Sequence, residues 1–361
     1  MPSAASAGTL HAVTASEEHA GIRRLVAAVG QGPTHGRSLT RDEARTALEA
    51  IMDGVATRAQ AGALLLLQRY RGEAPEELLG YVDAVRGRTL PFHPKVEGLL
   101  DVGSPHDGRS KHVVVSPAAS IVAAAAGVPI VMHGEPDVGP KRGLPIGDVI
   151  AALGVNTDAG PDAVARGIEA CGLGYIRQAQ LVPELHALKP LREELGLRTA
   201  LHMVEKISGC GDAPYLLLGV AHLRYLKHLA PALAQLGYRK TMVVQGMEGH
   251  EDVATSRGAR IVEIDERGEN EWRIDPTSLG LEPATDDDLA PGDAARSARF
   301  TLSVIEGNAT PSQRDLALLN AALRIQLAGL ADDLPSALDA ARQALASGEA
   351  MRRLEAWRAV A

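Results

Sequence analysis

The sequence lacks the features that mark several common protein classes. Its 361 residues include only two cysteines, Cys171 and Cys210, which are too few for a disulfide framework and show no metal-binding spacing. The longest apolar stretch, residues 121–132, is too short to span a membrane. The N-terminus has no basic region followed by an apolar run, so no signal peptide is expected. These absences predict a soluble cytoplasmic protein.

Aromatic residues and positive charge are also scarce. Aromatic side chains make up 3% of the chain, and 37 basic residues face 45 acidic ones, for a net charge of −8. This balance excludes a generally basic nucleic-acid binder but leaves a local basic patch open. Hydrophobic residues make up 45%, and the length suffices for two domains with substantial cores.

The first ninety residues have the signals of short helices. Residues 1–15 are small and polar and are expected to be disordered. Capping boxes at 40–43 and 57–60 each open an apolar helical pattern. Pro75 suits the first turn of a further helix. Together with a helix that precedes the first box, these signals predict a four-helix domain over residues 16–90.

The pattern changes after residue 98. Short β-rich runs alternate with helical segments, the runs lying at residues 99–102, 128–133, 216–220, 241–246 and 260–264. This alternation predicts βαβ units and a mainly parallel central sheet. The expected fold class is therefore α/β, with a small N-terminal helical domain and a large α/β domain over residues 91–361. Helices near 181–196 are expected to return to the helical domain.

Parallel sheets bind ligands beyond the carboxyl ends of their strands, so the loops after the strands are candidate sites. The first loop, residues 101–117, leads into a helix that Ser116 is expected to cap. Backbone amides near a helix start attract anions, and Arg109, Lys111 and His112 add positive charge. Asp107 could bind a metal or support the turn. An ordinary solvated loop explains the same pattern, so phosphate binding is one of two open interpretations.

A second glycine-rich loop follows the next strand, over residues 133–147. Its glycines let the backbone approach a ligand closely, and Lys141 and Arg142 lie at its centre. A mobile surface loop is the alternative, and His133 alone is more typical of a core histidine.

An acidic turn occupies residues 245–252. Glu248, Glu251 and Asp252 follow the end of a strand, and adjacent carboxylates suit Mg²⁺, which usually bridges to substrate phosphates. A solvated acidic turn is the common alternative.

Two arginines lie in residues 190–199. The guanidinium groups of Arg192 and Arg198 match a carboxylate or phosphate in shape. Pairing with Glu193 and Glu194 on the surface is the ordinary explanation.

The order and spacing of these segments resemble those of the anthranilate phosphoribosyltransferase family over about residues 38–360. The segments that carry the resemblance are SLTRDEARTALEAIMDGVATRAQAG and its continuation to residue 86, AAAAGVPIVMHG, PLREELGLRT, VVQGMEGHED, and the helical stretch of residues 318–357. The resemblance implies transfer of a phosphoribosyl group from phosphoribosyl diphosphate to anthranilate, in tryptophan biosynthesis, with Mg²⁺.

The resemblance also implies roles for individual residues. Arg192 falls on the arginine that binds the carboxylate of the aromatic acceptor, and Glu251 and Asp252 fall on the metal pair in reversed order. In the two loops, Gly103, Asp107, Ser116, His133, Gly134 and Lys141 match positions of the family. We add Ser104 and His106 of the first loop and Arg142 of the second as candidate substrate-binding residues.

Some positions depart from the family pattern. In the first loop Pro105 removes a backbone donor and His106 adds bulk, while Glu135 in the second loop would repel a polyphosphate. A diphosphate is therefore expected to bind through charged side chains. We predict a catalytic set of Lys141, Arg109 and Lys111, with Arg142 across the cleft.

Two alternatives follow from the same departures. A divergent branch of the family includes members that bind nucleic acid, which Arg109, Lys111, His112, Lys141 and Arg142 would contact as one basic groove. A protein that binds a phosphorylated small molecule without turnover is the second alternative.

A homodimer is also expected from the helical domain itself. The apolar face that includes Leu48, Ile51 and residues 64–67 exceeds what four short helices can bury.

Overall fold

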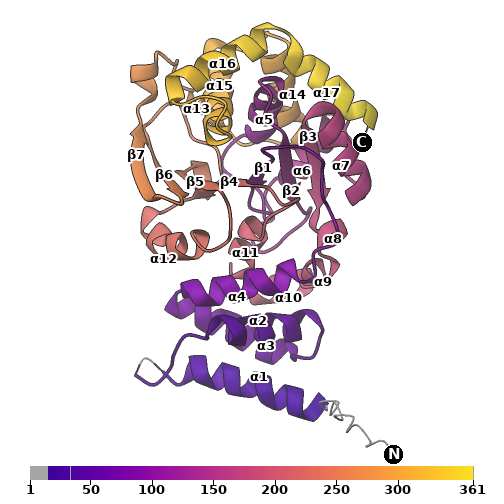
Figure 1. The fold of residues 1–361 in the computed structure, drawn as a ribbon, viewed down its shortest axis with the longest axis vertical. Coiled ribbons are helices and arrows are strands. Elements are labelled where there is room, and N and C mark those ends of the chain that lie inside the picture. Colours follow the sequence, from indigo (N-terminus) through magenta and orange to yellow (C-terminus); the bar gives the residue numbers. More distant parts are fainter. Residues whose placement is uncertain (1–14, 33, 361) are drawn as a thin grey trace, which may run out of the picture.

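The computed structural model describes residues 15–32 and 34–360, and it has a stack of helices at one end and an α/β domain at the other (Figure 1). The segment expected to be disordered lies outside the described residues, apart from Ala15. The helical end contains α1 (Ala15–Gly30), α2 (Arg41–Met52), α3 (Arg58–Arg71) and α4 (Pro75–Arg86). Both capping boxes form, between Thr40 and Glu43 and between Thr57 and Gln60.

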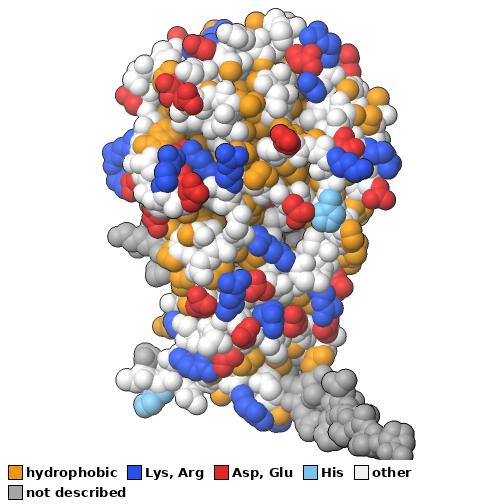
Figure 2. All heavy atoms as spheres, in the orientation of Figure 1, with side chains coloured by type: hydrophobic (Ala, Val, Ile, Leu, Met, Phe, Trp, Pro, Cys, Tyr) orange, Lys and Arg blue, Asp and Glu red, His pale blue; other side chains and the backbone are white. Residues whose placement is uncertain are grey.

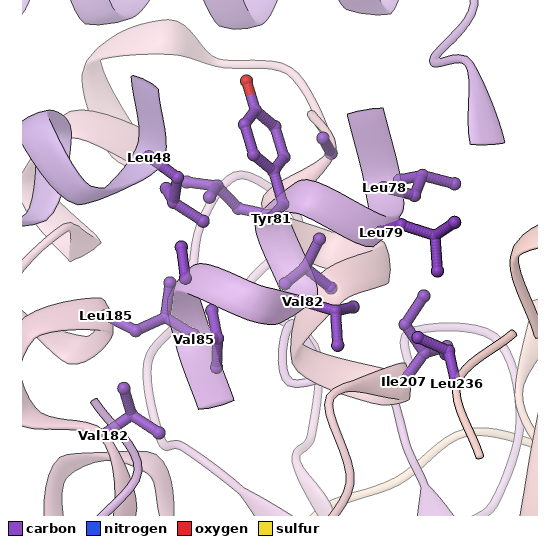
Figure 3. Close-up of a cluster of buried hydrophobic side chains, with 14 of the residues drawn as sticks. Leu48, Leu78, Leu79, Tyr81, Val82, Val85, Val182, Leu185, Ile207 and Leu236 are labelled. Atoms are coloured by element: carbon purple, nitrogen blue, oxygen red, sulfur yellow. The ribbon is translucent and has the colours of Figure 1, made fainter. Parts of the chain in front are cut away.

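Helix α4 is buried on two sides. Tyr81 points toward the other N-terminal helices, where its hydroxyl donates to Gln68 Oε1 at 2.6 Å (Figure 3). Val82 and Val85 lie on the side of Ile207 and other residues of the α/β domain (Figure 3). Because one helix contributes to both regions, the two are joined by apolar packing as well as by the chain.

The apolar face expected to form a dimer is largely covered within the chain. Leu48, Leu64 and Leu65 are fully buried, and Ile51 is nearly so, while Leu66 and Leu67 are half-buried. The surplus of apolar surface that motivated a dimer is therefore smaller than the sequence indicates. A homodimer stays a prediction.

The α/β domain is built on a seven-stranded sheet with the order β3-β2-β1-β4-β5-β6-β7. The first five strands in that order are parallel, and β6 and β7 are antiparallel. The strands are β1 (Leu100–Gly103), β2 (Ile130–Gly134), β3 (Leu173–Arg177), β4 (Tyr215–Val220), β5 (Lys240–Gln245), β6 (Ala259–Asp265) and β7 (Gly268–Ile274). The α/β fold class predicted from the sequence is confirmed.

Helices cover both faces of the sheet. They are α5 (Ser116–Ala125), α6 (Ile146–Ala152), α7 (Pro161–Cys171), α8 (Gln178–Leu181), α9 (Pro183–His186), α10 (Lys189–Leu195), α11 (Leu201–Ile207), α12 (Leu223–Leu233), α13 (Asp286–Leu289), α14 (Ala294–Ile305), α15 (Pro311–Leu327), α16 (Leu334–Ala346) and α17 (Glu349–Val360). Alternate residues of β4 enter different cores: Leu217 packs with α5 and α15, and Leu216 and Leu218 pack on the side of α11 and α12.

Helix α10 lies against α3 of the helical end. A Cβ placed on Gly62 would lie 3.1 Å from Leu195, and Arg58 forms an ion pair with Glu194. In the part of the chain that the structure describes, no helix is long and apolar enough to cross a bilayer.

The sheet order has a functional consequence. The chain leaves β1 to build β2 and β3 on one side, and returns to build β4 and β5 on the other. This reversal between β1 and β4 leaves a crevice at their carboxyl ends, where ligands of such sheets bind.

Candidate active site

A cleft of about 320 Å³ lies at this reversal point, between the helical end and the sheet. Its walls come from the loops after β1, β4 and β5, from α11 and from α3. The charged residues among its lining are Arg69, Asp107, Arg198, Lys206 and Glu248. Three cations and two carboxylates give the cleft a positive character that suits an anionic ligand.

The two carboxylates of the cleft already have partners. Asp107 accepts two hydrogen bonds from Arg198, at 2.6 and 2.8 Å, and is fully buried. Glu248 accepts from Lys141 Nζ at 2.5 Å, and Lys141 also donates to the carbonyl of Gly108 at 2.8 Å. Lys141 therefore links the loops after β1, β2 and β5.

Lys206 is a buried cation in the cleft wall. Its Nζ donates to the carbonyl of Gly219 at 2.7 Å, and no carboxylate forms an ion pair with it among the described residues. Burial lowers the pKa of Lys206 to about 8, although Glu251 opposes the shift. The ammonium group is therefore charged at neutral pH and available to an anion.

The predicted metal pair forms a sealed ionic cluster with two arginines. Asp252 accepts from Arg109 Nη2 at 2.5 Å through one oxygen and from Arg324 Nη2 at 3.1 Å through the other. Glu251 Oε1 accepts from Ser104 Oγ at 2.7 Å and lies 3.5 Å from Arg109. All of these side chains are buried, so two carboxylates and two guanidinium groups balance each other away from the cleft.

This cluster changes the interpretation of two residues, Arg109 and Ser116. Arg109 was expected to reach a diphosphate, but it is buried and its guanidinium group contacts Asp252 instead. Ser116 was expected to cap a helix, but Val115 is the N-cap and makes no side-chain cap. The hydroxyl of Ser116 accepts from Arg324 at 2.6 Å.

The carboxylate pair does not fit a resident Mg²⁺ in this arrangement. Both oxygens of Asp252 are engaged by arginine, and only Glu251 Oε2 is buried without a hydrogen-bond partner. Among the described residues no three His, Cys, Asp or Glu side chains converge on one point that would hold a metal. A Mg²⁺ that arrives bound to phosphates needs few protein ligands, and this is the form in which the site could meet it.

A second group of buried polar side chains is linked by short contacts that begin at Asp101 in β1. His133 Nε2 lies 3.0 Å from Asp101 Oδ1, and His133 Nδ1 lies 3.0 Å from His106 Nε2. His106 Nδ1 continues to Gln178 Nε2 at 3.2 Å and to Glu205 Oε2 at 3.5 Å. Burial lowers the pKa of His106 to about 3, so this ring is neutral near pH 7. The hydrogen-bonded pair thus joins His106, in the loop after β1, to His133 in β2.

Arg192 lies at the end of this series of polar contacts. It is buried, and its Nη1 donates to Glu205 Oε2 at 2.6 Å. Burial opposes ionisation of Glu205, but Arg192 and His106 outweigh it and lower the pKa of this carboxyl. Nε and Nη2 of Arg192 are buried and have no hydrogen-bond partner among the described residues, but Arg192 does not line the cleft.

The other predicted positions have structural or surface surroundings. Gly103 and Gly134 are at strand ends in close packing, because a Cβ would lie 2.6 Å from the carbonyl oxygen of Lys206 or 3.1 Å from the hydroxyl of Tyr175. Arg142 is exposed and pairs with Asp137 and Glu193.

The carboxylate of Glu135 is not a free charge in the second loop. Its carboxylate accepts from Arg177 at 2.8 Å and from the backbone amide of Ala179 at 2.9 Å. The repulsion of a polyphosphate expected at this position is therefore reduced by an internal cation.

The basic groove expected for nucleic acid does not form from its five proposed residues. Arg109 is buried, and Lys141, His112 and Arg142 contact internal carboxylates. Lys111 is exposed, and its backbone amide donates to Glu248. Figure 2 shows basic and acidic side chains interspersed on the visible face, with no continuous basic stripe.

Sequence reasoning missed three cations of the site: Arg69, Lys206 and Arg324. Arg324 had a readable signal, because a lone arginine amid the apolar residues of α15 indicates a buried partner. Arg69 and Lys206 had none, since their position in the cleft depends on how α3 and α11 meet the sheet.

Comparison with known proteins identifies the family to which the chain belongs. The glycosyl transferase family helical bundle domain matches residues 24–89, and the glycosyl transferase family a/b domain matches residues 101–351.

Named relatives match along most of the chain. An anthranilate phosphoribosyltransferase of Thermomicrobium roseum is 36% identical over 336 residues, which cover 92% of this chain and 95% of the relative. That of Agrobacterium fabrum is 34% identical over 334 residues, covering 92% and 95%.

Solved structures agree with this assignment. The anthranilate phosphoribosyltransferase of Thermus thermophilus superposes with a TM-score of 0.82 at 28% identity, covering 94% of this chain and 98% of that one. The Saccharomyces cerevisiae enzyme in complex with PRPP and Mg has the same fold, with a TM-score of 0.80 at 19% identity, covering 96% and 98%. The chain therefore belongs to the anthranilate phosphoribosyltransferase family, a family of pentosyl-transferring enzymes within the glycosyl transferases.

Proposed function

We propose that this protein transfers a phosphoribosyl group from phosphoribosyl diphosphate to a small aromatic amine, with anthranilate the first acceptor to test. The observation that carries the proposal is the cleft at the strand reversal, where Lys206 is a buried cation that no carboxylate pairs with directly. Relatives that are 34–36% identical along almost the whole chain have this activity in their names.

The chemistry requires little acid–base work. The bond from ribose C1 to the diphosphate oxygen breaks, its electron pair leaves with diphosphate, and positive charge develops on the sugar. The amine nitrogen forms the new bond to C1 and then loses a proton. The protein's contribution is to hold both reactants in line and to stabilise the leaving charge.

The residues of the cleft can divide these tasks. Lys206 and Arg198 would face the leaving diphosphate, with Arg69 closing the cleft from the helical end. Arg192 is not part of the cleft lining, but the two nitrogens of its guanidinium group that lack a partner would orient the carboxylate of an acceptor that reaches it. The yeast relative binds PRPP together with Mg, and we propose that Mg²⁺ enters here as part of the diphosphate substrate.

The test is a transfer assay on purified protein with phosphoribosyl diphosphate, MgCl₂ and anthranilate, followed by product chromatography. Wild type is expected to form product, and the Lys206→Met variant is expected to form none. Absence of product with anthranilate and with other aromatic amines, from protein that unfolds cooperatively, would contradict the proposal.

A homodimer and nucleic-acid binding are two further proposals. A homodimer would be tested by sedimentation at micromolar concentration. Nucleic-acid binding has little support from the five residues on which it rested: among the residues that the structure describes, Lys111 is exposed and in no ion pair, whereas Lys141 and Arg142 pair with carboxylates.

A further inference from the structure

The carboxylate of Glu248 is held in a pocket of hydrogen-bond donors at the edge of the cleft. Oε1 accepts from the backbone amide of Lys111 at 2.5 Å, and Oε2 accepts from the amide of Ser110 at 3.1 Å. Oε2 also accepts from the Ser110 hydroxyl at 3.3 Å and from Lys141 Nζ at 2.5 Å. His112 Nδ1 lies 3.2 Å from Oε1. We call this set of donors on residues 110–112 and 141 the anion nest.

The nest has the composition of a phosphate site. Two consecutive backbone amides converge on one anion, a lysine ammonium adds full charge, and a hydroxyl and an imidazole complete the set. A phosphate group presents several oxygens to such donors, whereas a carboxylate presents two. Glu248 thus uses donors that a phosphate group could use more completely.

The backbone at Glu248 indicates that this placement is held by the contacts of the side chain. Glu248 adopts φ 54° and ψ 13°, the left-handed region that an ordinary residue avoids because its Cβ crowds the backbone. The next residue, Gly249, also has a positive φ, of 82°, so the whole turn after β5 is in an uncommon conformation. Removing the carboxylate from the nest would let the turn relax.

The position of Glu248 connects the nest to the ligand cleft. Glu248 lines the cleft together with Arg198 and Lys206, while its carboxylate is 6% exposed. Burial raises the pKa of Glu248, but Lys141 and the amides of Ser110 and Lys111 outweigh it and lower the pKa to about 2. The group is therefore an anion at any physiological pH.

We propose that Glu248 is a built-in competitor for the phosphate site: its carboxylate fills the anion nest until a diphosphate group of the ligand displaces it. The identity of the ligand in this inference rests on the proposed function. The competition itself is argued from the geometry of the nest. Displacement would free Lys141 and the two amides for the ligand.

The experiment is calorimetric titration of inorganic diphosphate, without divalent metal, into wild type and Glu248→Gln. Removing the internal competitor should tighten binding by about tenfold or more, because the affinity of a site scales with the fraction of molecules in which it is free. Glu263→Gln is the matched control, since Glu263 also pairs with a lysine, Lys240 at 2.9 Å, but lies in β6. The Glu263→Gln variant should bind diphosphate with the same affinity as wild type.

Two additions keep the test decisive. Glu248→Asn is a second neutral variant that tolerates a left-handed backbone, and it should tighten binding as well. The rise in melting temperature on adding diphosphate should be larger in both variants than in wild type. Unchanged or weaker binding in both variants would show that Glu248 only braces the loops, and would overturn the inference.

The transfer assay separates this inference from the proposed function. If wild type makes product but neither Glu248 variant binds diphosphate more tightly, the inference alone fails. If the variants bind more tightly but no aromatic amine is a substrate, the competitor stands and the proposed function fails.

Discussion

The cleft and the sealed ionic cluster behind it contain the same kinds of charged residues. The cleft is suited to bind a ligand, whereas the cluster stabilises the fold. In the cluster, Arg109 and Arg324 face Glu251 and Asp252, and every group is buried. In the cleft, Lys206 has a carbonyl as its hydrogen-bond partner, and Arg198 is 40% exposed although it pairs with Asp107. Completeness of pairing, more than the presence of charge, distinguishes a structural cluster from a ligand site.

The largest effect is expected from breaking the sealed cluster. Arg324→Met leaves Asp252 buried with one cation fewer, and it should lower the free energy of unfolding by about 3–5 kcal/mol. Denaturant unfolding measures this. Arg342→Met on α16 is the control, because its pair with Asp339 is exposed and should cost less than about 1 kcal/mol. Equal losses in the two variants would mean that the cluster contributes no more than a surface pair.

The opposite behaviour is expected at the cleft. Lys206→Met removes a buried cation that has no carboxylate partner, so the protein should stay folded while its affinity for inorganic diphosphate falls about tenfold or more, which corresponds to about 1.4 kcal/mol. Calorimetry and thermal unfolding together measure the two effects. A variant that unfolds easily but binds as wild type would reverse the roles assigned to cleft and cluster.

The cleft should also respond to pH. Lysine is cationic below its pKa, and the pKa of Lys206 is lowered to about 8, so the positive charge is present at pH 7 and largely lost at pH 9. Diphosphate affinity should therefore fall between these values more steeply in wild type than in Lys206→Arg, whose guanidinium stays charged. Parallel pH profiles for the two proteins would contradict the assignment, and the comparison cancels titration of the ligand itself.

The smallest effect concerns the acceptor. Because Glu205 neutralises Arg192, an acceptor carboxylate meets a half-satisfied guanidinium. Glu205→Gln should strengthen anthranilate binding several-fold and leave the neutral isostere 2-aminobenzamide nearly unchanged. Fluorescence titration of both compounds gives the ratio. If the two affinities change together, Arg192 does not read the charge of the acceptor.

Local signals made the fold predictable. Thr40 and Thr57 were identified as helix caps from a four-residue pattern each, and five strands followed from short apolar runs. Two strands were missed for physical reasons: β3 passes directly into α8, and β7 is a largely exposed edge strand with mostly polar residues. Neither has the isolated apolar run by which strands are recognised.

The candidate site was only partly predictable, because its contacts join distant parts of the chain. The loops were identified correctly as segments after strands, and Lys141 does lie where three of them meet. Arg109 was assigned to the diphosphate and Glu251 to a metal, because each was considered alone. Their mutual contact spans 142 residues, and no local pattern contains it.

The shared helix α4 has a consequence for how the molecule comes apart. Its residues pack between the helical end and residues of the α/β domain such as Ile207 and Leu236 (Figure 3). The same apolar cluster includes residues of the sheet, so neither region can unfold without exposing the other. Heat or denaturant should then produce one cooperative transition, and the backbone amides of α4 should exchange with deuterium only when the whole protein opens. A chain with two lobes would in this respect behave as a single folding unit.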